Sequence, residues 1–152
     1  MPVRGAAVGD RCHDGRMRGR RQYDPSTPRE SRHDYWGVVV DAPDAPALAK
    51  FYGDLLGWET YVNTPEDAGI SPNDGVTYLA FQTSPTYKRP AWPNAPGAQQ
   101  MMLHLDFEVE DLAVAVEDAI ALGAQLADFQ PQDNVRVLLD PAGHPFCLYA
   151  DE

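Results

Sequence analysis

The chain has 152 residues, 43% of them hydrophobic, which is enough apolar material for one compact domain with a real core. Its formal net charge is −11, divided unevenly: residues 1–34 hold eight arginines and five acids (+3), whereas residues 35–152 hold 4 basic and 18 acidic residues (−14). Phosphate binding needs a concentrated basic surface, so residues 35–152 are not expected to bind nucleic acid. No run approaches the ~18 apolar residues of a membrane span, and no membrane partner is expected.

Residues 1–34 are predicted to be a disordered basic leader. They are rich in Arg, Gly, Pro and Ser and lack periodic apolar residues, and they also lack the apolar stretch of a secretory signal. The two cysteines, Cys12 in the leader and Cys147 in a predicted strand, form no disulfide framework. A reducing, cytoplasmic location is therefore expected.

The body of the chain after the leader begins with a predicted strand over residues 36–42, which is apolar and β-branched except for Asp41. Asp44 is placed to cap a helix that Gly57 ends. The apolar residues of this helix recur at the spacing of one helical face: Leu48, Phe51, Tyr52, Leu55 and Leu56. Residues 58–63 and 76–83 are predicted strands, joined by a connection over 64–75 that is rich in Pro, Asp, Gly and Asn.

Residues 84–100 are predicted to be a stiff, Pro-rich linker, with a lid as the alternative role for Tyr87, Lys88, Arg89 and Trp92. A strand over 103–109 follows, and Asp111 caps a second helix. One face of that helix carries Leu112, Ala115, Val116, Ala119 and Ile120. Residues 125–130, 135–139 and 146–150 are further predicted strands, with a turn over 140–143.

The same pattern therefore occurs twice in the chain: a strand, a capping Asp, a helix and a terminating Gly. The capping aspartates are 67 positions apart (44 to 111) and the terminating glycines 66 (57 to 123). An internal repeat of this length predicts a duplicated unit. We expect an α+β domain over 35–152, with modules at about 35–83 and 101–151.

Three stretches carry a resemblance to a known family. Phe51 and Tyr52 followed by Leu55, Leu56 and Gly57, the start of the second unit (104–111), and the closing run (140–148) resemble the vicinal-oxygen-chelate superfamily. This superfamily includes glyoxalase I, bleomycin-resistance proteins and extradiol dioxygenases, and the bacterial glyoxalase-like domain group is the most similar. The resemblance covers about residues 36–150. It implies two βαβββ modules forming a curved mixed sheet around one cavity, helices outside, and a homodimer.

Metal-dependent members of the superfamily hold a divalent ion with ligands on the first and last strand of each unit. The matching positions here are Gly37, Ala80, His104 and Cys147, and only His104 is a usual ligand. Glycine and alanine offer no donor atom, and a register shift of two would replace Ala80 by Gln82. The resemblance therefore predicts no metal and no cofactor at the superfamily site.

Strand alternation gives candidate site residues. If Leu105 and Phe107 pack on their helix, then His104, Asp106 and Glu108 face the cavity. His104 with Asp106 is the candidate catalytic pair, as a general base and its partner, with a structural hydrogen-bonded His as the alternative. The candidate ligand-binding residues are Asp41, Tyr78, Gln82, Trp92, Glu108, Cys147 and Tyr149.

The leading hypothesis is a cytoplasmic glyoxalase-like protein that binds a small organic molecule in the cavity without the superfamily metal. The second is a lyase or isomerase in which His104 and nearby carboxylates transfer protons. The third is a metal-dependent lyase or dioxygenase with atypical ligands such as His104, Gln82 and Cys147. The scaffold alone does not choose among them, because one fold hosts many functions.

Overall fold

The computed structural model describes residues 17, 19–21 and 24–151. The chain divides into two compact units, Met1–Asp34 and Tyr35–Glu152. In the first, the described residues include a short 3₁₀-helix, Arg29–Ser31, and most of the predicted leader lies outside the described residues. Among the described residues, no helix is both long enough and apolar enough to cross a membrane.

The first module of the larger unit has one helix and four strands: β1 (Trp36–Ala42), α1 (Ala45–Leu56), β2 (Glu59–Asn63), β3 (Asp67–Ser71) and β4 (Thr77–Thr83). The strands form one sheet in the order β1-β4-β3-β2. β1 runs parallel to β4, and the other two pairings are antiparallel.

The second module repeats this plan with β5 (Leu105–Glu108), α2 (Leu112–Leu122), β6 (Gln125–Leu126), β7 (Val135–Leu139) and β8 (Pro145–Tyr149). Its sheet has the order β5-β8-β7-β6, again with the first and last strands parallel. The predicted α+β class and the two βαβββ modules are therefore confirmed.

Both helix boundaries follow the predicted capping chemistry. The Asp44 carboxylate accepts a hydrogen bond from the Ala47 backbone N–H (3.0 Å), and the Asp111 carboxylate accepts one from the Val114 N–H (3.1 Å). Gly57 then ends α1 in the left-handed conformation, φ 66°, which a residue without Cβ adopts at least cost.

Three sequence-based expectations about elements were wrong. The connection predicted over 64–75 contains β3, whose Ala68 and Ile70 are almost fully buried between β2 and β4. The strand predicted over 125–130 is only the two-residue β6. Ile120, predicted on the packed face of α2, is 45% exposed.

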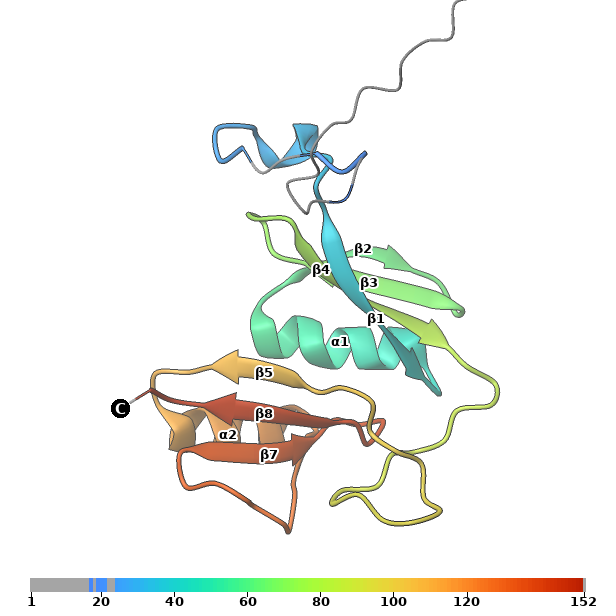
Figure 1. Cartoon of the computed structure of the whole chain (residues 1–152), viewed down its shortest axis with the longest axis vertical. Coiled ribbons are helices and arrows are strands. Elements are labelled where there is room, and N and C mark those ends of the chain that lie inside the picture. Colours follow the sequence, from blue (N-terminus) through green and yellow to red (C-terminus); the bar gives the residue numbers. More distant parts are fainter. Residues whose placement is uncertain (1–16, 18, 22–23, 152) are drawn as a thin grey trace, which may run out of the picture. The chain divides into compact units, whose positions relative to one another are not determined.

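The helices cover one side of the sheets, and the two modules share one core. In Figure 1, α1 lies behind β1 and α2 lies behind β8, in agreement with the contacts of α1 with β3 and β4 and of α2 with β8. Tyr52 of α1 stacks on Phe81 of β4 (ring centroids 5.7 Å apart) and meets Phe146 of β8 edge-on (5.9 Å). One helix of the first module therefore fills the core of both.

Candidate functional site

Each sheet has an open face, by which we mean the face opposite its helix. On β1 and β4 the paired residues of the open face are Gly37 with Tyr78, Val39 with Ala80, and Asp41 with Gln82. Val39 is 55% exposed, whereas its neighbours Val38 and Val40 pack against the core. Alternation along β1 is thus as predicted, and it presents both polar and aromatic groups away from the helix.

Two tyrosines lie on this open face directly over two glycines. The Tyr61 and Tyr78 rings meet edge to face, with centroids 6.2 Å apart and planes at 86°. A Cβ added to Gly69 would lie 2.3 Å from the Tyr61 ring, and one added to Gly37 would lie 2.3 Å from the Tyr78 ring. Only glycine lets the rings lie this close to the backbone. Tyr61 was not among the predicted ligand residues.

Asp41 and Gln82 bind each other at the far end of the same strand pair. The Gln82 side-chain amide donates to the Asp41 carboxylate at 2.6 Å, and both residues are exposed. The predicted residues Asp41, Tyr78 and Gln82 are therefore brought onto one face. Gln82 is engaged with Asp41 rather than with His104 or Cys147.

The open face of the second module gathers three metal-type donors. His104 Nε2 lies 3.0 Å from the Asp106 carboxylate, and Asp106 is paired across β5 and β8 with Cys147. One donor atom from each of the three lies within 4.8 Å of the other two. Glu108 and Tyr149 are paired further along the same strands, on the same face.

Cys147 is a protonated thiol at neutral pH. Burial, and then the neighbouring Asp106 carboxylate, raise the pKa of its thiol to about 11. A thiol of this kind is a poor nucleophile, because the thiolate is the reactive form. This argues against nucleophilic catalysis by Cys147 in the free protein.

The open faces are acidic. Arg136 is the only lysine or arginine in the eight strands of the described residues, and it pairs with Leu148 on the helix side. The open faces carry the carboxylates of Asp41, Asp106 and Glu108. They therefore favour neutral or cationic ligands over anionic ones.

Trp92, the remaining predicted ligand residue, is used in packing the linker. Its indole N–H donates to the Phe129 carbonyl at 3.1 Å, and its ring lies 6.1 Å from the Phe129 ring. The linker is thus attached to a loop of the second module at this point.

A buried hydrogen-bond network, which sequence reasoning missed, joins α1, the linker and the β7–β8 turn. Asp140 is 2% exposed and its carboxylate accepts from Tyr52 Oη (2.8 Å), from the Ala142 and His144 backbone N–H groups, and from His144 Nδ1 (2.9 Å). The other ring nitrogen of His144 lies 3.4 Å from Tyr87 Oη, which donates to the Ala142 carbonyl at 2.7 Å.

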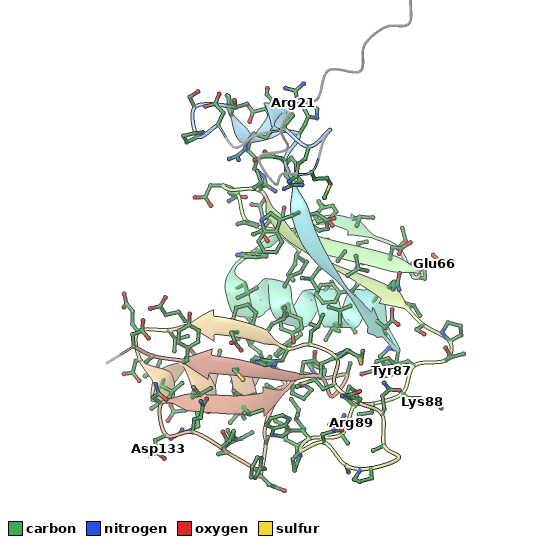
Figure 2. The ribbon with its side chains drawn as sticks, viewed as in Figure 1. Arg21, Glu66, Tyr87, Lys88, Arg89 and Asp133 are labelled. Carbon is green, nitrogen blue, oxygen red and sulfur yellow. The ribbon has the colours of Figure 1, made fainter. Side chains whose placement is uncertain are left out.

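Figure 2 shows Tyr87 and Arg89 of the linker beside this turn. Burial, and then the Asp140 carboxylate, raise the pKa of both tyrosines of the network, that of Tyr87 to about 12. Both phenols stay protonated and can act as donors. All these polar groups are satisfied within the fold, so the network is structural.

An open hollow of about 510 Å³ lies elsewhere, at the start of α1. Its lining is Pro43, Asp44, Pro46, Asn63, Thr64, Pro65 and Thr83. None of the predicted site residues lines it, and the helix cap Asp44 is the one titratable side chain of its lining. The open faces are therefore the better candidate site.

The residues at the superfamily's metal positions do not fit its four-ligand ion. The side chains of Gly37 and Ala80 have no atom that can bind a metal. A register shift of two along β4 would replace Ala80 by Gln82, but the Gln82 side chain is hydrogen-bonded to Asp41. The first module therefore has no ligand to contribute at either position.

The chain has two βαβββ modules of the same topology. Their helices lie on one side of the sheets and polar groups lie on the opposite faces, and this arrangement defines the vicinal-oxygen-chelate class. The sequence pattern of the glyoxalase-like domain matches residues 37–149, nearly the whole of both modules. The chain belongs to the glyoxalase-like domain family.

Solved structures of similar fold come from several bacteria. A glyoxalase/bleomycin resistance protein/dioxygenase family enzyme from Burkholderia phytofirmans is 20% identical (75% of this chain, 95% of that chain, TM-score 0.57). A glyoxalase-related enzyme from Fulvimarina pelagi is 21% identical (76% and 86%, TM-score 0.55). A glyoxalase/bleomycin resistance protein from Albidiferax ferrireducens is 18% identical (78% and 98%, TM-score 0.54). At these identities the likeness concerns the fold. A comparison with curated proteins finds no match.

Proposed function

We propose that this protein binds a small organic molecule on the open faces of its sheets, without the four-ligand metal site of the superfamily. The observation that carries the proposal is the tyrosine pair over Gly37 and Gly69, since two rings that lie directly on the backbone present an aromatic surface on the open face. The open faces of the described strands carry carboxylates and no lysine or arginine. This charge favours a neutral or cationic aromatic ligand.

Matched aromatic probes test this function. We expect the full chain to bind benzyltrimethylammonium more tightly than benzoate, measured by chemical-shift titration. Tyr78→Ala should weaken binding of the cation by about 3- to 30-fold, the equivalent of one aromatic or cation–π contact. Gly69→Ala should also weaken it, because the new Cβ displaces the Tyr61 ring while leaving the ring chemistry intact.

Phe129→Ala is the control, since it removes an exposed ring that lies on a loop and not on the open faces. Equal binding by Tyr78→Ala and the unaltered protein, or tighter binding of benzoate, would contradict the proposal.

Proton transfer is the second candidate function, and the 3.0 Å contact between His104 Nε2 and Asp106 favours it. A lyase or isomerase of this kind should exchange an acidic C–H of a bound ligand with deuterium from solvent. His104→Gln should abolish that exchange while leaving ligand binding in place. Exchange that is unchanged in His104→Gln would rule out this role.

We also propose a cytoplasmic homodimer. β1 lies at the edge of its sheet, and Trp36 at its start is 55% exposed, so an unpaired strand edge and a large apolar side chain are available together. Sedimentation at micromolar concentration should give a dimer, and a monomer would contradict the proposal.

A further inference from the structure

The helix of the second module, α2, is more apolar than its position at the surface requires. Nine of its eleven residues are apolar, and Glu117 and Asp118 are its only charged residues. Ala119 is nevertheless its only buried residue, whereas α1 has five buried residues among twelve. A helix that is apolar nearly all round is normally buried on more than one side. The composition of α2 is therefore that of a helix with a second partner.

One side of α2 packs on its own module, and the other side is exposed. Leu112 and Val116 pack against the core, to which Ala119 belongs. The opposite side, which we call the outer face of α2, consists of Ala113, Val114, Glu117, Ile120 and Ala121. Val114 is 52% exposed and Ile120 is 45% exposed. The two largest apolar side chains of the outer face are thus available for contact.

The internal repeat provides a comparison for this face. With the capping aspartates aligned, Lys50 and Asp54 of α1 correspond to Glu117 and Ala121 of α2, 67 positions further on (50 to 117, 54 to 121). Lys50 Nζ and the Asp54 carboxylate form an exposed ion pair at 2.6 Å, as is usual on a solvated helix surface. The outer face of α2 lacks such a pair, so its apolar character is not a requirement of the repeated fold.

The charge around the outer face determines which kind of partner fits it. Residues 90–135, which include α2, contain eight acidic residues and no lysine or arginine. A second copy of the chain packed symmetrically on this face would bring the same acids against them. An anionic membrane surface would be repelled as well. The partner must combine apolar side chains with basic ones, and an amphipathic helix with a basic polar face does so.

We propose that the outer face of α2 binds a basic amphipathic helix of a partner protein. Val114 and Ile120 contact the apolar stripe of the partner helix, and Glu117 lies beside its lysines or arginines. Two helices packed in this way bury their apolar side chains against each other. The proposal does not depend on the small-molecule function, because α2 lies on the side of its sheet opposite the open face.

A matched pair of synthetic helical peptides tests the proposal. Both peptides carry leucine along one face, and the other face carries lysine in one peptide and glutamate in the other. We expect the full chain to bind the lysine peptide more tightly, measured by fluorescence anisotropy at physiological salt. Amide chemical shifts should change most over residues 112–122. The double variant Val114→Ala/Ile120→Ala should weaken binding of the lysine peptide by about 10-fold, because two aliphatic side chains lose their contacts.

Reversal of single charges tests the electrostatic part. Glu117→Lys gives α2 the residue that α1 has at the corresponding position, and it should weaken binding of the lysine peptide by about 5- to 10-fold. Asp133→Lys is the matched control, since it makes the same change of charge at an exposed residue outside α2. It should weaken binding by no more than about 2-fold.

Phe129→Ala is the apolar control, because it removes a ring that is 49% exposed and lies outside α2, and it should leave the affinity unchanged. Equal weakening by Glu117→Lys and Asp133→Lys would show that the attraction is spread over the whole acidic surface and would overturn the proposal. Unchanged binding by Val114→Ala/Ile120→Ala would overturn it too. Loss of self-association in that double variant would show that a second copy covers the outer face, which would also overturn it.

Discussion

Replacing Asp140 by alanine is expected to destabilise the protein by about 3–5 kcal/mol, the cost of breaking a buried, hydrogen-bonded charged group. The change removes the acceptor of four donors, among them His144 Nδ1 and the hydroxyl of Tyr52, which is 1% exposed. Urea denaturation followed by circular dichroism measures the free energy of unfolding.

Asp133→Ala is the control for this prediction. Asp133 is exposed and labelled at the edge of the second module in Figure 2, and its replacement should change the free energy of unfolding by about 0.5 kcal/mol or less. Asp140→Asn keeps a side-chain acceptor and should be less damaging than Asp140→Ala. A loss below about 1 kcal/mol for Asp140→Ala would contradict the role given to the network.

Replacing Phe146 by alanine should cost about 3–5 kcal/mol, the usual range for a buried phenylalanine. Phe146 is fully buried in β8, and its ring meets Phe51 and Tyr52 of α1 at 6.0 Å and 5.9 Å. Because these contacts join the two modules, the variant should still unfold in one transition that shifts to lower urea, followed both by tryptophan fluorescence and by circular dichroism.

Ile120→Ala is the matched control, an apolar truncation on α2 at a site that is 45% exposed, with an expected loss of less than about 1 kcal/mol. Two separate transitions in Phe146→Ala, or in the unaltered protein, would show that the modules have independent cores.

Local chemistry made much of the fold predictable. Asp44, Asp111 and Gly57 act on their own neighbours in the chain, so a cap or a left-handed glycine can be recognised without tertiary information. β3 could not be predicted in the same way. Its Asp67, Gly69 and Ser71 have low strand propensity, and the strand exists because it is paired on both sides.

The candidate site, like the fold, could be predicted from the sequence only where local patterns determine it. Alternation along one strand correctly placed Asp41 and Asp106 on open faces, since it needs only the local period of two. The pairing of Asp106 with Cys147 depends on the register between two strands, and these residues are 41 positions apart (106 to 147). The pairing of Tyr52 with Asp140 depends on how two modules pack, and no local pattern contains that information.

The network around Asp140 has a consequence for exchanging modules between relatives. The turn that ends β7 is completed by a hydroxyl from the first module, Tyr52, and by one from the linker, Tyr87. A chimaera that received only the second module would inherit a buried carboxylate without one of its donors. In this protein α1, the linker and the β7–β8 turn should therefore be transferred together, although their residues are far apart in sequence.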